Sequence, residues 1–232
     1  MKKVLFSFLF MGALATVQAQ TADEVVAKHI EAIGGKDKLA AIKTLVREGA
    51  ISVQGMDLPL KLSVEQDKGF RFDINVMGTA GYQIYTPTAG WNYMPFQGGS
   101  GVEEVPADKL QESQDNLDVQ GELFNYAQKG HTIELQGKEK TDGVDCYKLK
   151  VNTKYGLTKT YFIDATTYYI NKIKTESKNS EGKNSEITYG NYKKNAEGYV
   201  FAHTMTRSEG EVSFEKITVN EKLADGIFKP AQ

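Results

Sequence analysis

Apolar and polar residues alternate along most of this chain with the two-residue period of a β-strand. The two clearest runs cover residues 58–64 and 70–76, and Asp67 to Gly69 supply turn residues between them. Each run predicts a strand with one face to bury and one face in water, and the two strands should form a hairpin. The residues on the apolar faces of the two runs are Leu58, Leu60, Leu62, Val64, Phe70, Phe72, Ile74 and Val76.

Further short runs with strand character follow, separated by turn-forming pairs such as Asp142-Gly143 and Glu197-Gly198. Because these links are short, consecutive strands should pair as an antiparallel meander. About eleven strands with one apolar face must close into a barrel, stack as two sheets or curl around other elements. The further candidate strands are residues 44–53, 81–86, 90–95, 132–138, 144–152, 158–164, 168–177, 185–194, 200–207 and 211–220.

Three segments depart from this period and predict helices around which a sheet could curl. Residues 22–33 carry apolar side chains at helical spacing, with Thr21 as the N-cap and glycines as the stop. Residues 37–42 predict a second, short helical turn. Residues 106–128 predict helix in the middle of the strand sequence, divided into two pieces at Gly121.

The N-terminus has the pattern of a cleaved secretory signal. Lys2 and Lys3 precede an apolar run over residues 4–17, and a small-residue cleavage site follows, which ends at Ala19. We therefore expect residues 1–19 to be a signal peptide and the mature chain to begin at Gln20 as one domain, residues 20–232, with no lipid anchor. No later apolar run approaches the roughly 18 residues that a bilayer-spanning helix needs.

Composition and motifs argue against several classes of function. The net charge of −2 and the interspersed charges give no basic stripe for a nucleic acid. Cys146 is the only cysteine, so we expect it to be packed on a strand, without an intramolecular disulfide. His29, His131 and His203 are far apart and form no metal-ligand motif, so each should be a surface or half-buried residue. Since no nucleophile, metal or cofactor motif is present either, we expect a protein that is not an enzyme and needs no cofactor.

Aromatic residues are frequent on the predicted strands, and Trp91 and Tyr93 are among them. A curled sheet would collect such side chains on its concave face. Periodicity alone gives equal weight to a filled sandwich core and to a ligand cavity.

Three segments carry a resemblance to a known family: residues 25–35, 90–96 and 227–230. The middle one, Gly90-Trp91-Asn92-Tyr93-Met94-Pro95-Phe96, is similar to a tryptophan, aromatic and proline pattern that precedes the lid helices in that family. In these segments and in the order of its elements the chain resembles the LolA-like periplasmic lipoprotein carriers and the related outer-membrane lipoprotein-sorting proteins.

The resemblance implies a mainly β fold with some helix: an unclosed antiparallel barrel whose concave apolar face is covered by helices. It also implies a periplasmic carrier that binds acyl chains of lipoproteins or lipids between sheet and lid, for transfer toward the outer membrane. Inner- and outer-membrane transfer proteins would then be partners of a monomeric chain. We expect Leu58, Leu60, Leu62, Phe70, Phe72, Ile74, Trp91 and Tyr93 to line the cavity, and Leu117, Leu123 and Phe124 to lie on the lid, residues 106–128.

Two other classes of function stay open. A binding protein for another apolar molecule, such as a quinone or a free fatty acid, would share all these features. A structural envelope protein would instead have a filled interior and make its contacts through edge strands.

The chain departs from the carriers at one position. In the carrier an arginine early in a strand holds the lid closed, and the resemblance implies a position near Gln66 or Asp67 for it. Arg71 is nearby, but its place in the alternation turns it away from the apolar face.

Overall fold

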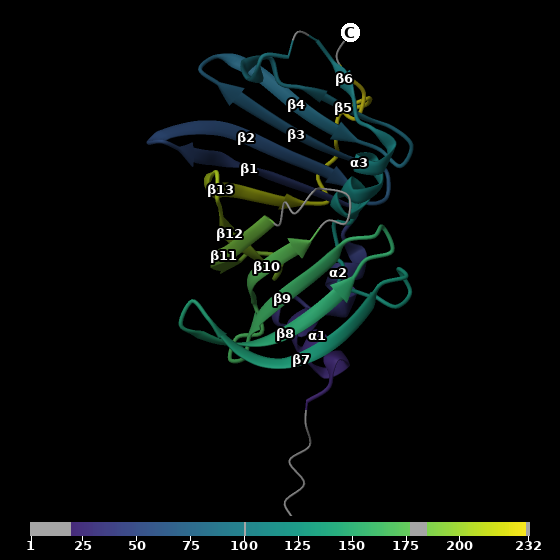
Figure 1. Cartoon of the computed structure of the whole chain (residues 1–232), viewed down its shortest axis with the longest axis vertical. Coiled ribbons are helices and arrows are strands. Elements are labelled where there is room, and N and C mark those ends of the chain that lie inside the picture. The colour runs from purple at the N-terminus through teal and green to yellow at the C-terminus, as the bar shows by residue number, and fades with distance from the viewer. Residues whose placement is uncertain (1–19, 100, 177–184, 231–232) are drawn as a thin grey trace, which may run out of the picture.

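A single sheet organises the computed structural model, which describes residues 20–99, 101–176 and 185–230. The predicted signal peptide, residues 1–19, lies outside these ranges. The sheet has 13 strands and curls around the N-terminal helices without closing (Figure 1). The strands are β1 (Thr44–Val53), β2 (Met56–Glu65), β3 (Gly69–Val76), β4 (Thr79–Tyr85), β5 (Gly90–Tyr93), β6 (Glu103–Glu104), β7 (Thr132–Thr141), β8 (Val144–Asn152), β9 (Thr158–Asp164), β10 (Ile170–Glu176), β11 (Ser185–Lys194), β12 (Val200–Arg207) and β13 (Gly210–Val219).

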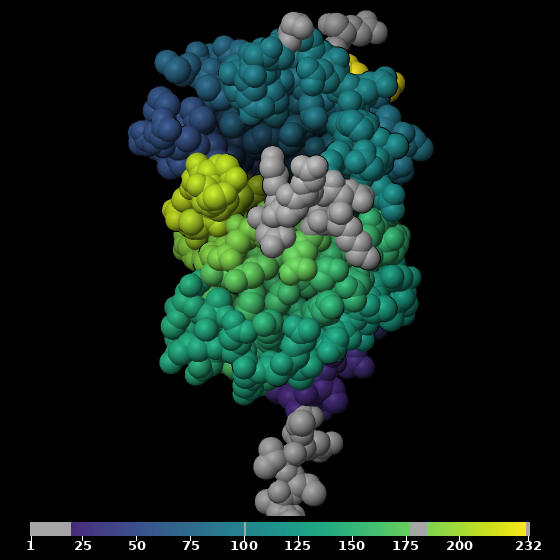
Figure 2. Space-filling model, in the orientation of Figure 1, coloured from purple at the N-terminus to yellow at the C-terminus, as the bar shows by residue number. Residues whose placement is uncertain are grey.

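The strand order is β6-β5-β4-β3-β2-β1-β13-β12-β11-β10-β9-β8-β7, and every pairing is antiparallel. The predicted meander is therefore confirmed, and β1 with β13 is the one neighbouring pair that is not consecutive along the chain. In Figure 2 the N-terminal strands occupy one end of the molecule, the green strands β7–β10 occupy the other, and β13 lies between them.

Strands β1 and β13 approach each other closely at Gly49. The pairing of β1 with β13 shifts register between Glu48 and Gly49, as at a β-bulge. A Cβ atom at Gly49 would lie 2.0 Å from the carbonyl oxygen of Ser213, so only glycine allows this approach of the two strands.

Helix α1 (Ala22–Ala32) begins with the predicted cap. Thr21 accepts a hydrogen bond from the backbone N–H of Glu24, and the Glu24 side chain accepts one from the backbone N–H of Thr21. Val25 and Val26 of this helix pack on the inner face of β8 and β9. The short helix α2 (Lys36–Ala41) follows, so both predicted N-terminal helices are confirmed.

The predicted helix over residues 106–128 is wrong for most of its length. Helix α3 covers only Ala107–Glu112, and a 3₁₀ turn, η2 (Ser113–Leu117), extends it; a separate 3₁₀ turn, η1 (Pro95–Gln97), precedes β6. The remaining residues form turns, because Asp118 is extended and Gly121 and Asn125 adopt positive φ angles of 81° and 51°. We keep the name lid segment for residues 106–128.

The last described residues cross the outer face of the sheet. The ring of Phe228 lies directly over Gly69, where a Cβ atom would come within 2.4 Å of it. On the same outer face Arg71 donates a hydrogen bond to the carbonyl oxygen of Ile227 at 3.0 Å and pairs with Asp73. Arg71 therefore faces away from the concave side, as its place in the alternation predicts.

Among the described residues, no helix is long and apolar enough to cross a membrane.

Candidate functional site

A cavity of about 400 Å³ lies between the concave face of the sheet and the lid segment. Its walls come from α1, α2, the strands β1 to β3 and β9 to β12, and residues 115–124 of the lid segment. The lining is mainly aliphatic and aromatic, with a few charged side chains. Such a mixture is typical of sites that hold an apolar molecule and orient it by a small number of polar contacts.

Six of the eight predicted lining residues share the inner face of β2 and β3, because the register places them opposite one another. Leu62 and Phe70 line the cavity itself. Leu60 and Phe72 belong to an adjacent core cluster on the same face. The remaining two, Leu58 and Ile74, are half-buried and lie farther along the strands.

Trp91 and Tyr93 do not share this face. In the pairing of β3, β4 and β5, Trp91 lies opposite Ile84, which lies opposite Arg71 on the outer side. The expectation that Trp91 and Tyr93 face the cavity is therefore wrong. Part of the outer face is covered as well, by the C-terminal segment, so aromatic residues are buried on both sides of these strands.

The three lid residues are buried, as core positions of the cover should be. Leu123 packs with Val25 and Val26 of α1, and Phe124 packs with Leu39 of α2. Leu123 and Phe124 also line the cavity, whereas Leu117 lies at the end of η2 against the sheet.

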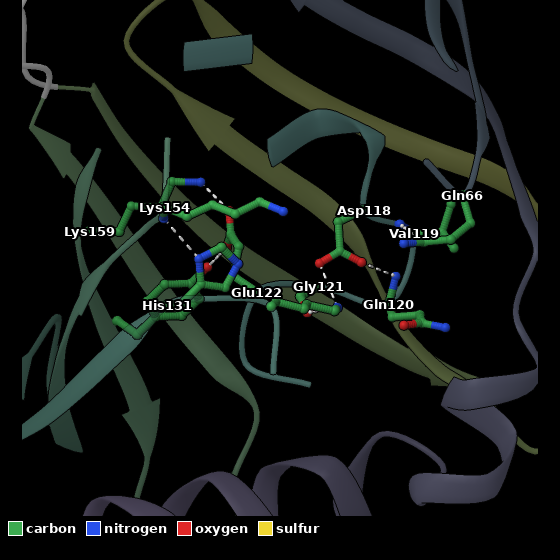
Figure 3. A network of polar contacts seen from close by, with 11 residues as sticks. Gln66, Asp118, Val119, Gln120, Gly121, Glu122, His131, Lys154 and Lys159 are labelled. Atoms are coloured by element: carbon green, nitrogen blue, oxygen red, sulfur yellow. Dashed lines mark hydrogen bonds and ion pairs between the residues drawn. The ribbon is translucent and has the colours of Figure 1, made fainter. Parts of the chain in front are cut away.

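Several hydrogen bonds tie the lid segment to the N-terminal half of the sheet. Gln66 accepts a bond from the backbone N–H of Val119 at 2.9 Å (Figure 3). The backbone N–H of Asp67 donates to the carbonyl oxygen of Leu117 at 3.2 Å. Gln114 in turn donates to the carbonyl oxygen of Thr86 at 3.0 Å. The resemblance implied an arginine at Gln66 or Asp67. Here the side-chain oxygen of Gln66 and the backbone N–H of Asp67 hold the lid segment instead.

On the other side, the lid segment is tied to β9 by a buried ion cluster. Lys159 contacts Glu122 and lies 3.1 Å from Asp115, and the hydroxyl of Tyr161 also contacts Glu122. Burial raises the pKa of Glu122 above its usual range. Burial alone would lower the pKa of Lys159, but the carboxylates of Glu122 and Asp115 outweigh it and raise that pKa.

Hydrogen bonds of Asp118 and Lys129 stabilise the turn that lies between Val119, which is bound to Gln66, and Glu122, which is bound to Lys159. Asp118 accepts hydrogen bonds from the backbone N–H of Gln120 at 3.1 Å and from Lys129 at 2.6 Å. Lys129 also donates to the carbonyl oxygen of Gly121 at 3.0 Å. Figure 3 shows Asp118 between the Gln66–Val119 bond and the group formed by Glu122 and Lys159. The polar contacts therefore fix the lid segment at both sides of the cavity.

Arg47 is a charged cavity residue that the sequence did not predict, and the lining residues of β9 to β12 were not predicted either. Arg47 lies on β1 opposite Leu62 of β2, on the inner face, and its guanidinium lies 5.7 Å from the ring centre of Phe214. Its Nε is buried without a hydrogen-bond partner among the described residues. Burial lowers the pKa of Arg47 below its usual range, although an arginine stays charged at neutral pH. The signal was present in the alternation of β1, where Arg47 occupies an inward position between Leu45 and Gly49.

The histidines differ in burial from the prediction, because His29 and His131 are buried. The ring Nδ1–H of His29 donates to the carbonyl oxygen of Tyr168 at 2.8 Å, and burial lowers the pKa of His29 to about 4. Cys146 is buried on β8 as predicted. Within the described ranges, no group of three His, Cys, Asp or Glu side chains is arranged to hold a metal ion.

Solved structures with the same fold are known, although no family model and no curated protein matches the sequence. A LolA superfamily protein from Nitrosomonas europaea covers 91% of this chain and 99% of its own, with 13% identity and a TM-score of 0.57. A domain named for outer membrane lipoprotein sorting, from Vibrio parahaemolyticus, covers 89% and 95%, with 16% identity and a TM-score of 0.55. A DUF1329 family protein from Desulfovibrio piger covers 88% and 95%, with 15% identity and a TM-score of 0.51. The chain therefore has the LolA-like open-barrel fold over nearly its whole described length.

Proposed function

We propose that this protein is a periplasmic carrier that holds acyl chains of a lipoprotein or lipid in its cavity and delivers them toward the outer membrane. The observation that carries the proposal is the apolar cavity between a LolA-like sheet and a polar-tied lid segment. Its role is binding rather than catalysis.

The physical need for such a cavity is clear. Burying a methylene group stabilises it by about 0.8 kcal/mol, so a long acyl chain is almost insoluble in the aqueous periplasm. A carrier must cover the chain during transit and also release it. Release requires the polar contacts of the lid segment to break and Leu123 and Phe124 to leave their clusters, while the pairing of the strands stays intact.

The proposed ligand contacts follow the geometry of the inner face. Leu62 and Phe70 contact the chain directly, and Leu58, Leu60, Phe72 and Ile74 continue the same apolar surface. Leu123 and Phe124 cover the chain from the lid segment, and Leu117 holds the same segment against the sheet at the end of η2.

The remaining proposals concern the state of the protein in the cell. Residues 1–19 direct export and are removed, and residues 20–232 act as one unit and as a monomer. Donor and acceptor proteins in the inner and outer membranes load and unload it. A nucleic-acid partner is not part of this proposal.

The size of the cavity favours a second candidate, a binding protein for one small apolar molecule. A volume of about 400 Å³ falls within the roughly 300–1,000 Å³ of sites for small ligands. A carrier for three acyl chains would have to open further than the present structure does.

The first experiment is mass spectrometry of the small molecules that accompany the exported protein, purified without detergent. Near-stoichiometric phospholipid or acylated peptide supports the carrier, and a different apolar molecule supports the second candidate. A protein that carries nothing and ignores added fluorescent fatty acid would contradict both and point to a structural role.

A substitution tests the location of the site. Leu62→Glu places a charge in the cavity and should abolish fatty-acid uptake in a protein that still folds. The matched control is Ser213→Glu, which places the same charge at an exposed strand position. Uptake that survives Leu62→Glu would overturn the assignment, and Phe72→Glu extends the test along the same face.

A further inference from the structure

The cavity contains a positive charge that the fold does not neutralise. Arg47 is absent from every ion pair found among the described residues, and its Nε lies buried without a partner there. Arg47 as a whole is half-buried, and a charge that is partly removed from water gains from an anionic partner.

The carboxylates that line the cavity form ion pairs with lysines and not with Arg47. Asp115 and Glu122 both contact Lys159 of β9. Asp118 pairs with Lys129. No rearrangement within this cluster is needed for the cavity to accept an anion beside Arg47.

The surroundings of Arg47 are otherwise apolar. Its register partners on the two neighbouring strands are Leu62 and Ile217, and the ring of Phe214 lies beside the guanidinium. Leu62 and Phe70 extend from this point along the cavity wall. A fixed cation at one place and hydrocarbon next to it are complementary to a molecule with one anionic head and one apolar tail.

We propose that Arg47 binds the anionic head group of a single-chain amphiphile whose chain lies against Leu62 and Phe70. The head is an oxyanion, a carboxylate or a phosphate, because a guanidinium donates two parallel hydrogen bonds to either group. This inference rests on the proposed function, in that the cavity must hold an acyl chain, and adds the chemical class of the ligand and the residue that orients it.

The volume of the cavity agrees with this class. About 400 Å³ suits a ligand with one chain better than a lipid with three, given that small-molecule sites span roughly 300–1,000 Å³.

The test compares ligands that differ only at the head. Dodecanoate, dodecyl phosphate, dodecylammonium and 1-dodecanol are titrated into the exported, delipidated protein by calorimetry, below their aggregation concentrations. We expect the two anions to bind at least ten-fold more tightly than the alcohol and the ammonium to bind weakest, as a charge-assisted hydrogen bond predicts. If dodecanoate binds more tightly than dodecyl phosphate, the natural head group is a carboxylate, and the reverse order indicates a phosphate.

Arg47→Leu should lower the affinity for the two anions by about ten- to a hundred-fold and change that for 1-dodecanol by less than about three-fold. Arg47→Lys keeps the charge without the planar pair of donors and should fall between Arg47→Leu and the unsubstituted protein. Lys216→Leu, which removes a cation from an exposed position of β13 outside the cavity lining, is the matched control and should leave all four affinities nearly unchanged.

The outcomes separate the two proposals. Equal binding of alcohol and anions, or an equal loss of both with Arg47→Leu, overturns the role of Arg47 and leaves the apolar cavity in place. Binding of none of the four amphiphiles overturns the proposed function and this inference together. If Arg47→Leu fails to fold, the affinities of the unsubstituted protein and of Arg47→Lys for the four amphiphiles decide whether Arg47 binds the head group.

Discussion

Gln66 and Val119 are 53 residues apart in the sequence, yet the side-chain oxygen of Gln66 accepts a hydrogen bond from the backbone N–H of Val119 at 2.9 Å. The bond joins the β2–β3 hairpin to the lid segment beside the cavity (Figure 3). It is one of a small number of contacts whose loss would loosen the cover without altering the sheet.

Gln66→Leu should therefore make the lid segment more mobile. The N–H of Val119 loses its acceptor, at a cost of about 1 kcal/mol. Hydrogen exchange measured over residues 115–122 should become several-fold faster, with little change in β8 and β9. Gln136→Leu, at an exposed position of β7, is the control. Unchanged exchange in the lid segment would show that Gln66 does not hold it.

Lys159→Met should destabilise the protein strongly, because it leaves the carboxylates of Asp115 and Glu122 buried without a cation. The expected loss is about 3–5 kcal/mol in urea unfolding. The loss should be larger at pH 8 than at pH 5, since burial raises the pKa of Glu122 and its protonation at the lower pH relieves part of the buried charge.

The matched control for Lys159 is Lys148→Met. Lys148 pairs with Glu139 on the surface at 2.9 Å, and both side chains are substantially exposed. Its removal should cost less than about 1 kcal/mol. Similar losses for the two variants would contradict the view that the cluster under the lid segment is energetically coupled.

His29 makes stability depend on pH. Burial lowers its pKa to about 4 in the folded protein, against about 6.5 in an unfolded chain. The unfolded chain takes the proton first, so this contribution to stability is complete above pH 6.5 and is lost as the pH falls toward 4. The total loss is about 3 kcal/mol.

His29→Gln should flatten the dependence of unfolding free energy on pH in that window. Urea unfolding at half-unit intervals from pH 7 to pH 4 measures it for both proteins. His131, whose pKa burial also lowers, is present in both, so its contribution cancels from the comparison. A curve with the original slope would exclude His29 as its source.

Trp91→Ala should leave ligand uptake unchanged, because Trp91 lies on the outer face of β5. The same substitution should lower stability, since it opens space beside the C-terminal segment that includes Phe228. Fluorescent fatty-acid binding and thermal unfolding, measured on the same sample, separate the two effects. A loss of uptake at unchanged stability would place Trp91 in the ligand site.

The sequence predicted the strands well because each has a two-residue period that survives in the sheet. The faces of β2 and β3 and the capping of α1 by Thr21 follow from local rules alone. Periodicity does not tell which side of a strand is concave. It therefore could not place Trp91, since residues 221–230 bury part of the outer face as well.

The lid segment and Arg47 needed tertiary information. The helix predicted over residues 106–128 stops after η2, because contacts of Gln66 and Lys159 with this segment favour turns at Asp118 and Gly121. Arg47 interrupts the apolar side of β1 in the sequence, but only the closure of β1 against β13 shows that this side faces a cavity.

The route of the chain between β6 and β7 has a mechanical consequence. These consecutive strands lie at opposite edges of the sheet, so the segment between them spans the hollow with both ends anchored (Figure 1). Such a segment cannot swing away like a flap with one hinge. Flattening the sheet pulls its ends apart and straightens it, while tighter curling slackens it. The curvature of the sheet and the extension of this segment therefore change together. A partner that binds at either edge strand, β6 or β7, would alter the cavity without contacting the bound molecule.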